Sequence, residues 1–176
     1  ARGRVLWTDP WGGRWMGDKE PYQLLKGYAC YRATRDAAWL AAELPNLRRI
    51  ARYMLATDAD GDGLLEGASD ATYSEMSPLA GDSTYRTEDP YVNALSAYAL
   101  ERVAELEDAA QPGAGDSLRV AATRIRAALP RLWRPERRWF AYHAMPDGVR
   151  SWDHDHLQPV DALVFGGVTD SAIRQA

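Results

Sequence analysis

The stretch TRDAAWLAAELPNLRRIARYMLATDADGDGLLEGASDATY, residues 34–73, decides how the chain folds. Asp36 is a good N-cap, and apolar residues recur at helical spacing from there to Leu55. Pro45 lies inside this run and predicts that the helix kinks or restarts there. Alternating aspartates and glycines then end the helix, and LLE at residues 64–66 predicts a short strand. The stretch therefore predicts a long helix, a polar turn and the start of a long loop.

Further helices of the same kind are expected on both sides of this stretch. Each has an apolar stripe at helical spacing and an aspartate before its first turn. The expected caps are Asp18, Asp36, Asp89 and Asp116. A fifth helix is expected from near Pro159 to Gly166. Aromatic residues that alternate around a Pro-Asp-Gly turn predict a small β-hairpin over residues 137–152.

Helix pairs begin near Asp18, Asp89 and Pro159, about 70 residues apart, which is a repeat of architecture rather than of sequence. Each pair has one apolar stripe, which it cannot bury alone. The pattern therefore predicts an all-α fold in which helical hairpins form part of a larger toroid, with long loops and one small β-hairpin. Apolar stripes on the first and last helices would then face missing neighbours, and would favour self-association or contact with the missing part of the barrel.

Composition and charge argue against several classes of function. The net charge of −4 argues against a nucleic-acid partner, because phosphate binding needs a basic face. No apolar run approaches the roughly 20 residues of a membrane span. Cys30 is the single cysteine, which excludes an internal disulfide framework and leaves the compartment open. Seven tryptophans and nine tyrosines suit surfaces that are half apolar and half hydrogen-bonding.

The aspartate turn within residues 57–67 begins as a calcium loop does. Such loops supply ligands from alternate positions and end on a bidentate glutamate at the twelfth. The first three ligand positions are filled by Asp58, Asp60 and Asp62. Glu66 fits the ninth position, but the twelfth is Ser69, so the strongest ligand is missing. The other interpretation is a solvated turn after a helix, and we predict that the turn does not bind calcium tightly.

Residues 34–73 resemble the recurring hairpin of six-hairpin glycosidases, the (α/α)6-barrel glycoside hydrolases. The family's pattern is a Thr-Gly-Asp-type turn, an apolar helix with an internal proline, and Asp-x-Asp-x-Asp-Gly-Leu-x-Glu before a further aspartate. Arg35 stands where the turn glycine would be. The likeness extends from about Trp11 to Phe165 and is nearest to the non-lysosomal glucosylceramidase and β-glucosidase group. That group is resembled by SDATYSE at 69–75, DPYVNALSAYALERVAEL at 89–106 and WRPERRWFAYHAMPDGVRSWDHDHLQP at 133–159.

A weaker likeness joins DGDGLLEGASD, residues 60–70, to the processing α-glucosidase group. The resemblance implies a glycoside hydrolase, or a fragment of one, that cleaves glucoside-type bonds with carboxyl groups and without a cofactor. Residues 1–176 would be a single segment of the catalytic domain, truncated at both ends, with the nucleophilic glutamate before Ala1. The alternatives are a noncatalytic helical carbohydrate-binding or scaffold module and a calcium-stabilised helical domain.

Sugar cleavage needs two carboxyl groups across the glycosidic bond, so carboxyls in the long loops are the catalytic candidates. They are Asp155, Asp70, Asp153 and Glu75. The β-glucosidase likeness implies that Asp155 is the acid/base, although the alignment could slip to Asp153. The α-glucosidase likeness implies that Asp70 lies near the general acid, whereas the β-glucosidase likeness implies that it binds substrate. Glu75 is an alternative acid. Each of these side chains could instead be an ordinary turn or loop residue.

Aromatic and polar residues beside these carboxyls are candidates for holding the sugar. They are Trp11, Trp15, Tyr73, Trp152, His156 and Gln158. Tryptophans can stack on a pyranose ring, but they could equally cover the core above the first helix. The histidines that flank Asp155 also permit a zinc or iron site. His143 is the one further histidine, and we expect no metal.

Overall fold

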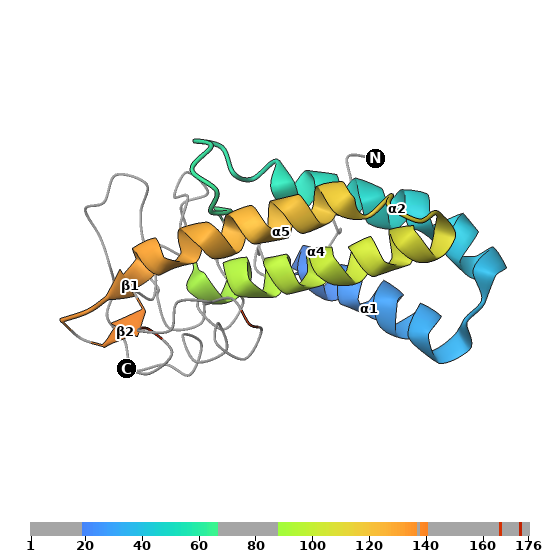
Figure 1. Cartoon of the computed structure of the whole chain (residues 1–176), viewed down its shortest axis with the longest axis horizontal. Coiled ribbons are helices and arrows are strands. Elements are labelled where there is room, and N and C mark those ends of the chain that lie inside the picture. The colour runs from blue at the N-terminus through green and yellow to red at the C-terminus, as the bar shows by residue number, and fades with distance from the viewer. Residues whose placement is uncertain (1–18, 67–87, 137, 141–165, 167–172, 174–176) are drawn as a thin grey trace, which may run out of the picture.

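The computed structural model describes residues 19–66, 88–136, 138–140, 166 and 173 (Figure 1). This part of the chain is mainly helical, which confirms the predicted all-α class. Its helices are α1 (Lys19–Thr34), α2 (Ala37–Leu55), α4 (Pro90–Ala110) and α5 (Asp116–Ala128). A 3-10 helix, η1 (Leu129–Leu132), follows α5 and leads to the short strands β1 (Trp133–Arg134) and β2 (Trp139–Phe140).

The four α-helices form two antiparallel hairpins that lie side by side, α1 with α2 and α4 with α5 (Figure 1). Helix α4 is central, because it packs against the other three helices and is buried along most of its length. The main core lies between α1, α2, α4 and α5 and contains the expected apolar stripes. Residues such as Leu47, Leu100 and Ile125 meet there. The hairpin architecture predicted from the sequence is therefore confirmed.

The break between α1 and α2 forms as the sequence predicts. Asp36 caps α2, and its Oδ1 accepts hydrogen bonds from Ala38 N at 2.9 Å and Trp39 N at 3.0 Å. Arg35, which stands where the resembled family has glycine, has a φ of 54°. Its backbone therefore adopts the left-handed conformation for which glycine is normally preferred.

Helix α2 is continuous across Pro45, so of the two predicted alternatives the restart is wrong, and the kink stays a prediction. Pro45 lies on the exposed side of α2, while Leu44 and Leu47 beside it are buried in the core. Packing of this stripe on α4 holds the helix together, although proline removes one backbone hydrogen bond.

The expected cap of α5 is also corrected. The N-cap is Gly115, which makes no side-chain hydrogen bond, and Asp116 is the first helical residue. A Cβ on Gly115 would lie 2.3 Å from the carbonyl oxygen of Ala104, so this position is set by close approach to α4. The amide of Gly115 donates to Asp108 Oδ1 at 2.9 Å, and this contact from α4 fixes the turn.

Residues 64–66 do not form the predicted strand. Instead, the side chain of Asn93 takes the place of a neighbouring strand. Leu65 N donates to Asn93 Oδ1 at 2.7 Å, and Asn93 Nδ2 donates to Leu65 O at 3.0 Å. Asn93 is fully buried in α4, so both hydrogen bonds are shielded from water.

The two strands lie within and just before the predicted hairpin. β2 pairs in antiparallel fashion with β1, with Trp133 opposite Phe140 and Arg134 opposite Trp139. The partner strand therefore comes from upstream residues that the sequence pattern did not indicate. The Pro-Asp-Gly turn, the second expected strand and the expected fifth helix lie outside the described residues, apart from a turn at Gly166.

Few large apolar side chains are exposed among the described residues: Tyr22 at 43% and Val120 at 69%. The described helices include no span that is long and apolar enough to cross a membrane. Self-association and the extent of the catalytic-domain segment stay predictions.

Candidate active site

All the predicted site residues lie outside the described residues. The catalytic candidates are Asp155, Asp70, Asp153 and Glu75, and the sugar-binding candidates are Trp11, Trp15, Tyr73, Trp152, His156 and Gln158. The structure does describe the residues that flank these candidates in the chain. These flanking residues indicate at which part of the fold the candidate active site lies.

The described residues that precede the segments with the candidate carboxyls lie toward one end of the helix bundle. In Figure 1 this end holds the last turn of α2, the first turn of α4, the end of α5 and the strand pair. Leu64, which lies six residues before Asp70, belongs to the same buried cluster as Phe140 of β2. Ala94 of α4 and Leu132 of η1 belong to this cluster as well. The segment after Leu64 and the segment after Phe140 are far apart in the sequence, but both follow residues of the same buried apolar cluster.

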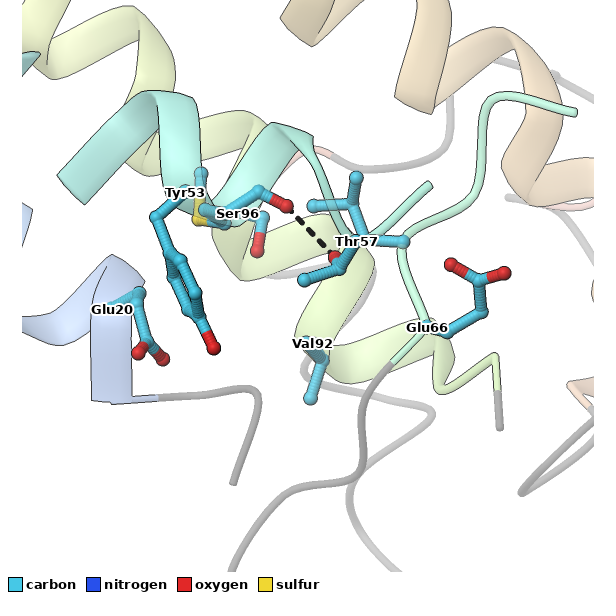
Figure 2. A pocket seen from close by; sticks show the side chains of 8 residues that line it. Glu20, Tyr53, Thr57, Glu66, Val92 and Ser96 are labelled. Carbon is cyan, nitrogen blue, oxygen red and sulfur yellow. Dashed lines mark hydrogen bonds between the residues drawn. The ribbon is translucent and has the colours of Figure 1, made fainter. Parts of the chain in front are cut away.

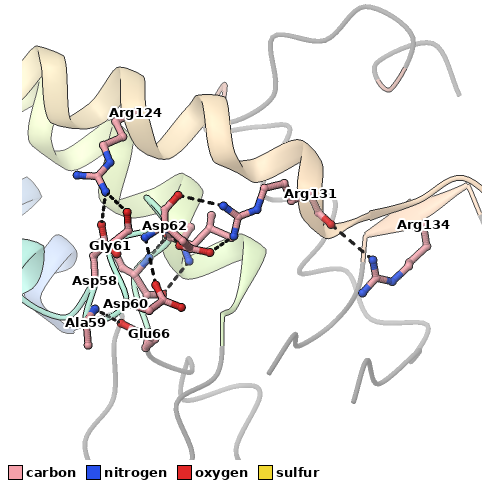
Figure 3. Close-up of polar contacts among 12 residues, drawn as sticks. Asp58, Ala59, Asp60, Gly61, Asp62, Glu66, Arg124, Arg131 and Arg134 are labelled. Carbon is pink, nitrogen blue, oxygen red and sulfur yellow. Dashed lines mark hydrogen bonds and ion pairs between the residues drawn. The ribbon is translucent and has the colours of Figure 1, made fainter. Parts of the chain in front are cut away.

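The aspartate turn after α2 is a polar feature at this end that is held by several hydrogen bonds and ion pairs (Figure 3). Asp60 Oδ1 accepts a hydrogen bond from Asp62 N at 3.1 Å, and Asp62 Oδ1 accepts one from Leu64 N at 2.8 Å. Gly61 and Gly63 have φ values of 79° and 98°. These are the self-bonded turns that Asp favours, with glycine supplying the left-handed backbone.

Two arginines fasten this turn to the α5 hairpin. Arg124 of α5 donates to Gly61 O at 2.5 Å and pairs with Asp58 Oδ2 at 3.1 Å. Arg131 of η1 donates to Asp62 O at 3.0 Å and forms an ion pair with the Asp62 carboxylate. Sequence reasoning missed both arginines, because only the tertiary fold brings α5 beside the turn.

Two buried glutamates lie next to the turn. Glu66 is 4% exposed, and its Oε2 accepts a hydrogen bond from Ala59 N at 2.9 Å. Glu88 is 5% exposed, and its pKa is raised to about 7 by burial first and then by the negative charges of Asp60, Glu66 and Asp58. Sequence reasoning missed Glu88, for which the only signal was an acid directly before a helix-capping aspartate.

Glu88 should make the protein less stable as the pH rises. Its folded pKa lies above the ordinary value of 4.5, so between pH 4.5 and about 7 the folded state keeps a proton that the unfolded state loses. The free energy of unfolding should therefore fall across this window, by at most about 3 kcal/mol from this group. We expect Glu88→Gln to remove this part of the pH dependence and to stabilise the protein at pH 8.

Urea unfolding at pH 5 and pH 8 measures the effect, with Glu136→Gln as the control because Glu136 is exposed. The control should keep the wild-type pH dependence. An unchanged difference between the two pH values in Glu88→Gln would contradict the assignment of a buried, protonated carboxyl.

The aspartate turn also offers the one candidate metal group found in the described part of the chain. One ligand atom from each of Asp58, Asp60 and Asp62 lies within 4.8 Å of the others. Glu66, which the sequence pattern placed at the ninth ligand position, adds negative charge near them. Two of the three aspartates already pair with arginines, so a calcium ion would compete with guanidinium groups for the same oxygens.

We therefore predict no tight binding of calcium to the wild-type turn. Isothermal titration calorimetry should give no heat that corresponds to a dissociation constant of micromolar order or below. Asp60→Ala is the control, because Asp60 belongs to the acidic group. Tight binding that this substitution abolishes would contradict the prediction.

A pocket lies between α1, α2 and α4 at the same end (Figure 2). Its lining residues are Glu20, Tyr53, Met54, Thr57, Leu65, Glu66, Val92 and Ser96. Ser96 Oγ is buried and has no hydrogen-bond partner among the described residues. Thr57 Oγ1 donates to Met54 O at 2.8 Å. The pocket has a mixed polar and apolar lining, and sequence reasoning did not predict it.

Comparison with known proteins adds the following. No protein-family model and no curated protein matches the chain. A rhamnosidase from Klebsiella oxytoca, solved with rhamnose bound, matches with a TM-score of 0.65 and 17% identity over 92% of this chain and 29% of its own. A GH63 mannosylglycerate hydrolase from Thermus thermophilus, in complex with glucose, matches with a TM-score of 0.70 and 15% identity. That match covers 98% of this chain and 55% of the hydrolase.

An uncharacterized conserved protein from Thermus thermophilus also matches, with a TM-score of 0.67 and 15% identity over 93% of this chain and 52% of that one. The chain shares the helical-hairpin fold of these proteins. It spans between 29% and 55% of their lengths. The resemblance to six-hairpin glycosidases is therefore confirmed for the fold, and the nearer likeness to the glucosylceramidase group stays a prediction.

Proposed function

We propose that this chain is part of a glycoside hydrolase that cleaves glucoside-type bonds by carboxylate acid–base chemistry. The observation that carries the proposal is the buried apolar cluster that contains both Leu64 and Phe140, because the two carboxylate-bearing segments follow these residues in the chain. Two carboxyl groups can act across one glycosidic bond only if their segments reach the same place. The shared apolar cluster at one end of the helical-hairpin fold supports the approach of the two carboxyl-bearing segments to each other.

In this proposal, Asp155 protonates the leaving glycosidic oxygen and Asp70 binds sugar hydroxyls in the same pocket. Asp153 and Glu75 are the alternative acids, and Trp11, Trp15, Tyr73 and Trp152 offer rings on which a sugar can stack. His156 and Gln158 supply hydrogen bonds. An acid that works near neutral pH needs a raised pKa, which burial and neighbouring carboxylates can provide. Glu88 is an example of this effect at the same end of the bundle.

The glucoside class rests on the sequence likeness described above, whereas the fold supports only the reaction class. One structural neighbour is named as a mannosylglycerate hydrolase in complex with glucose and another as a rhamnosidase with rhamnose bound. Sugar-cleaving enzymes with this fold thus use different sugars, so the fold supports the reaction class more strongly than the sugar.

The test is hydrolysis of a panel of aryl and natural glycosides by the full-length protein that contains this chain. The panel should include α- and β-glucosides, rhamnosides and mannosides, with released sugar measured directly. Glucoside hydrolysis well above that of the other sugars is expected. Hydrolysis of a glycoside of a different sugar would refute the glucoside specificity but not the proposal of a glycoside hydrolase. Sugar binding without turnover in calorimetry would instead favour a noncatalytic carbohydrate-binding module.

A further inference from the structure

We propose that Arg124 and Arg131 are positioning residues that hold the aspartate turn as a bound cation would, and thereby fix the start of the segment that carries Asp70. The link to Asp70 rests on the function proposed above. The holding of the turn by the arginines can be tested without it.

Each guanidinium binds the kind of oxygens that a calcium ion would bind. Arg124 contacts one main-chain carbonyl, that of Gly61, and one carboxylate, that of Asp58. Arg131 likewise contacts the carbonyl and the carboxylate of Asp62. Carbonyl and carboxylate oxygens are the usual ligands of calcium in loops with this spacing of aspartates. Charge-assisted hydrogen bonds of this kind are stronger than neutral ones, and they fix the geometry of the turn as well as stabilise it.

Further hydrogen bonds connect the turn that the arginines hold to the residues that follow it, up to Glu66. The carboxylate of Glu66 accepts a hydrogen bond from Ala59 N. The backbone N–H and the backbone C=O of Leu65 both form hydrogen bonds with the side chain of Asn93. Residues 58–66 therefore form one cross-bonded unit, which Arg124 fastens to α5, Arg131 to η1 and Asn93 to α4. Asp70 comes four residues after Glu66, so a shift of this unit would displace the start of its segment.

Removing the arginines would leave the turn with uncompensated charge. Asp58, Asp60 and Asp62 place ligand oxygens within 4.8 Å of one another, and like charges at this distance repel. Arg124 and Arg131 are 57% and 49% exposed, so their substitution opens no cavity in the core. A loss of order in the turn can thus be separated from a loss of the fold.

The experiment compares Arg124→Met/Arg131→Met with wild type in the full-length protein. Hydrogen exchange of the amides in residues 58–66 should become about tenfold faster in the double variant, with other helical amides unchanged. Millimolar calcium should slow this exchange again in the variant and leave wild type unchanged. Arg124→Lys/Arg131→Lys should recover part of the protection, because it keeps the charge.

The matched control is Arg119→Met. Arg119 is 43% exposed on α5 and pairs with Asp108 and Asp116, away from the aspartate turn. Its substitution should leave exchange in residues 58–66 unchanged. For the glycoside identified by the panel, KM should rise about tenfold in the double methionine variant while kcat changes less, because Asp70 is proposed to hold sugar hydroxyls.

Unchanged exchange in residues 58–66, or exchange that calcium fails to slow, would overturn the cation-like role of the arginines. Faster exchange with an unchanged KM, in a protein where Asp70→Asn raises KM, would overturn the link to Asp70. Absence of any glycoside hydrolysis would refute the proposed function, and the exchange and calcium results would still decide the role of the arginines.

Discussion

Asp155→Asn in the full-length protein is expected to lower kcat on a glycoside with a poor leaving group by about 10²–10⁴-fold. Asparagine keeps the shape of the side chain but carries no proton to give to the leaving oxygen. The loss should be smaller for an aryl glycoside with a good leaving group, because such a group departs with little protonation. Steady-state rates on the two substrates measure the difference, and circular dichroism checks that the variant is folded.

Asp70→Asn is the companion variant that separates the two likenesses. If Asp70 binds substrate, its loss should affect both substrates by similar factors and should raise KM. If Asp155→Asn keeps normal activity on the poor leaving group while Asp70→Asn loses it, the roles are reversed and the α-glucosidase likeness is the better guide. If neither substitution changes the rate, these segments do not carry the chemistry of a glycosidase.

Gly115→Ala is expected to destabilise the protein by about 3 kcal/mol or more, since the added methyl group overpacks a closed contact. The new Cβ would lie 2.3 Å from Ala104 O and 2.8 Å from Ala104 Cα, both in the backbone of α4. A backbone in the central helix cannot move aside as a flexible side chain would. Gly115 has a φ of −79°, which alanine adopts freely, so the effect comes from the contact and not from backbone strain.

Gly113→Ala is the matched control in the same turn. Gly113 has a φ of 81° and open space where a Cβ would stand, so its substitution introduces only backbone strain. That strain should cost about 1–2 kcal/mol. Urea unfolding of both variants gives the comparison, and a Gly115→Ala variant as stable as Gly113→Ala would contradict the close approach of α5 to α4.

Local sequence was sufficient for the four described α-helices and for the main part of the core. Asp36 and Asp89 cap helices as expected, because a cap depends only on the few residues that follow it. The apolar stripes of α2 and α5 are buried as expected, because their spacing alone places them on one face. The candidate site residues come from the sequence and its likeness to a family, and they stay predictions because they lie outside the described residues.

The features that failed or were missed depend on contacts between residues far apart in the chain. Pro45 is accommodated because α4 packs against the helix around it, and Gly115 replaces Asp116 as the cap because α4 approaches so closely. Asn93 replaces a strand partner for Leu65 across a separation of 28 residues. Glu88 has a raised pKa because the fold buries it first of all and also surrounds it with other carboxylates. Spacing along the chain determined which residues share a helix face, whereas burial and charge at the end of the bundle were decided by which elements the tertiary structure brings together.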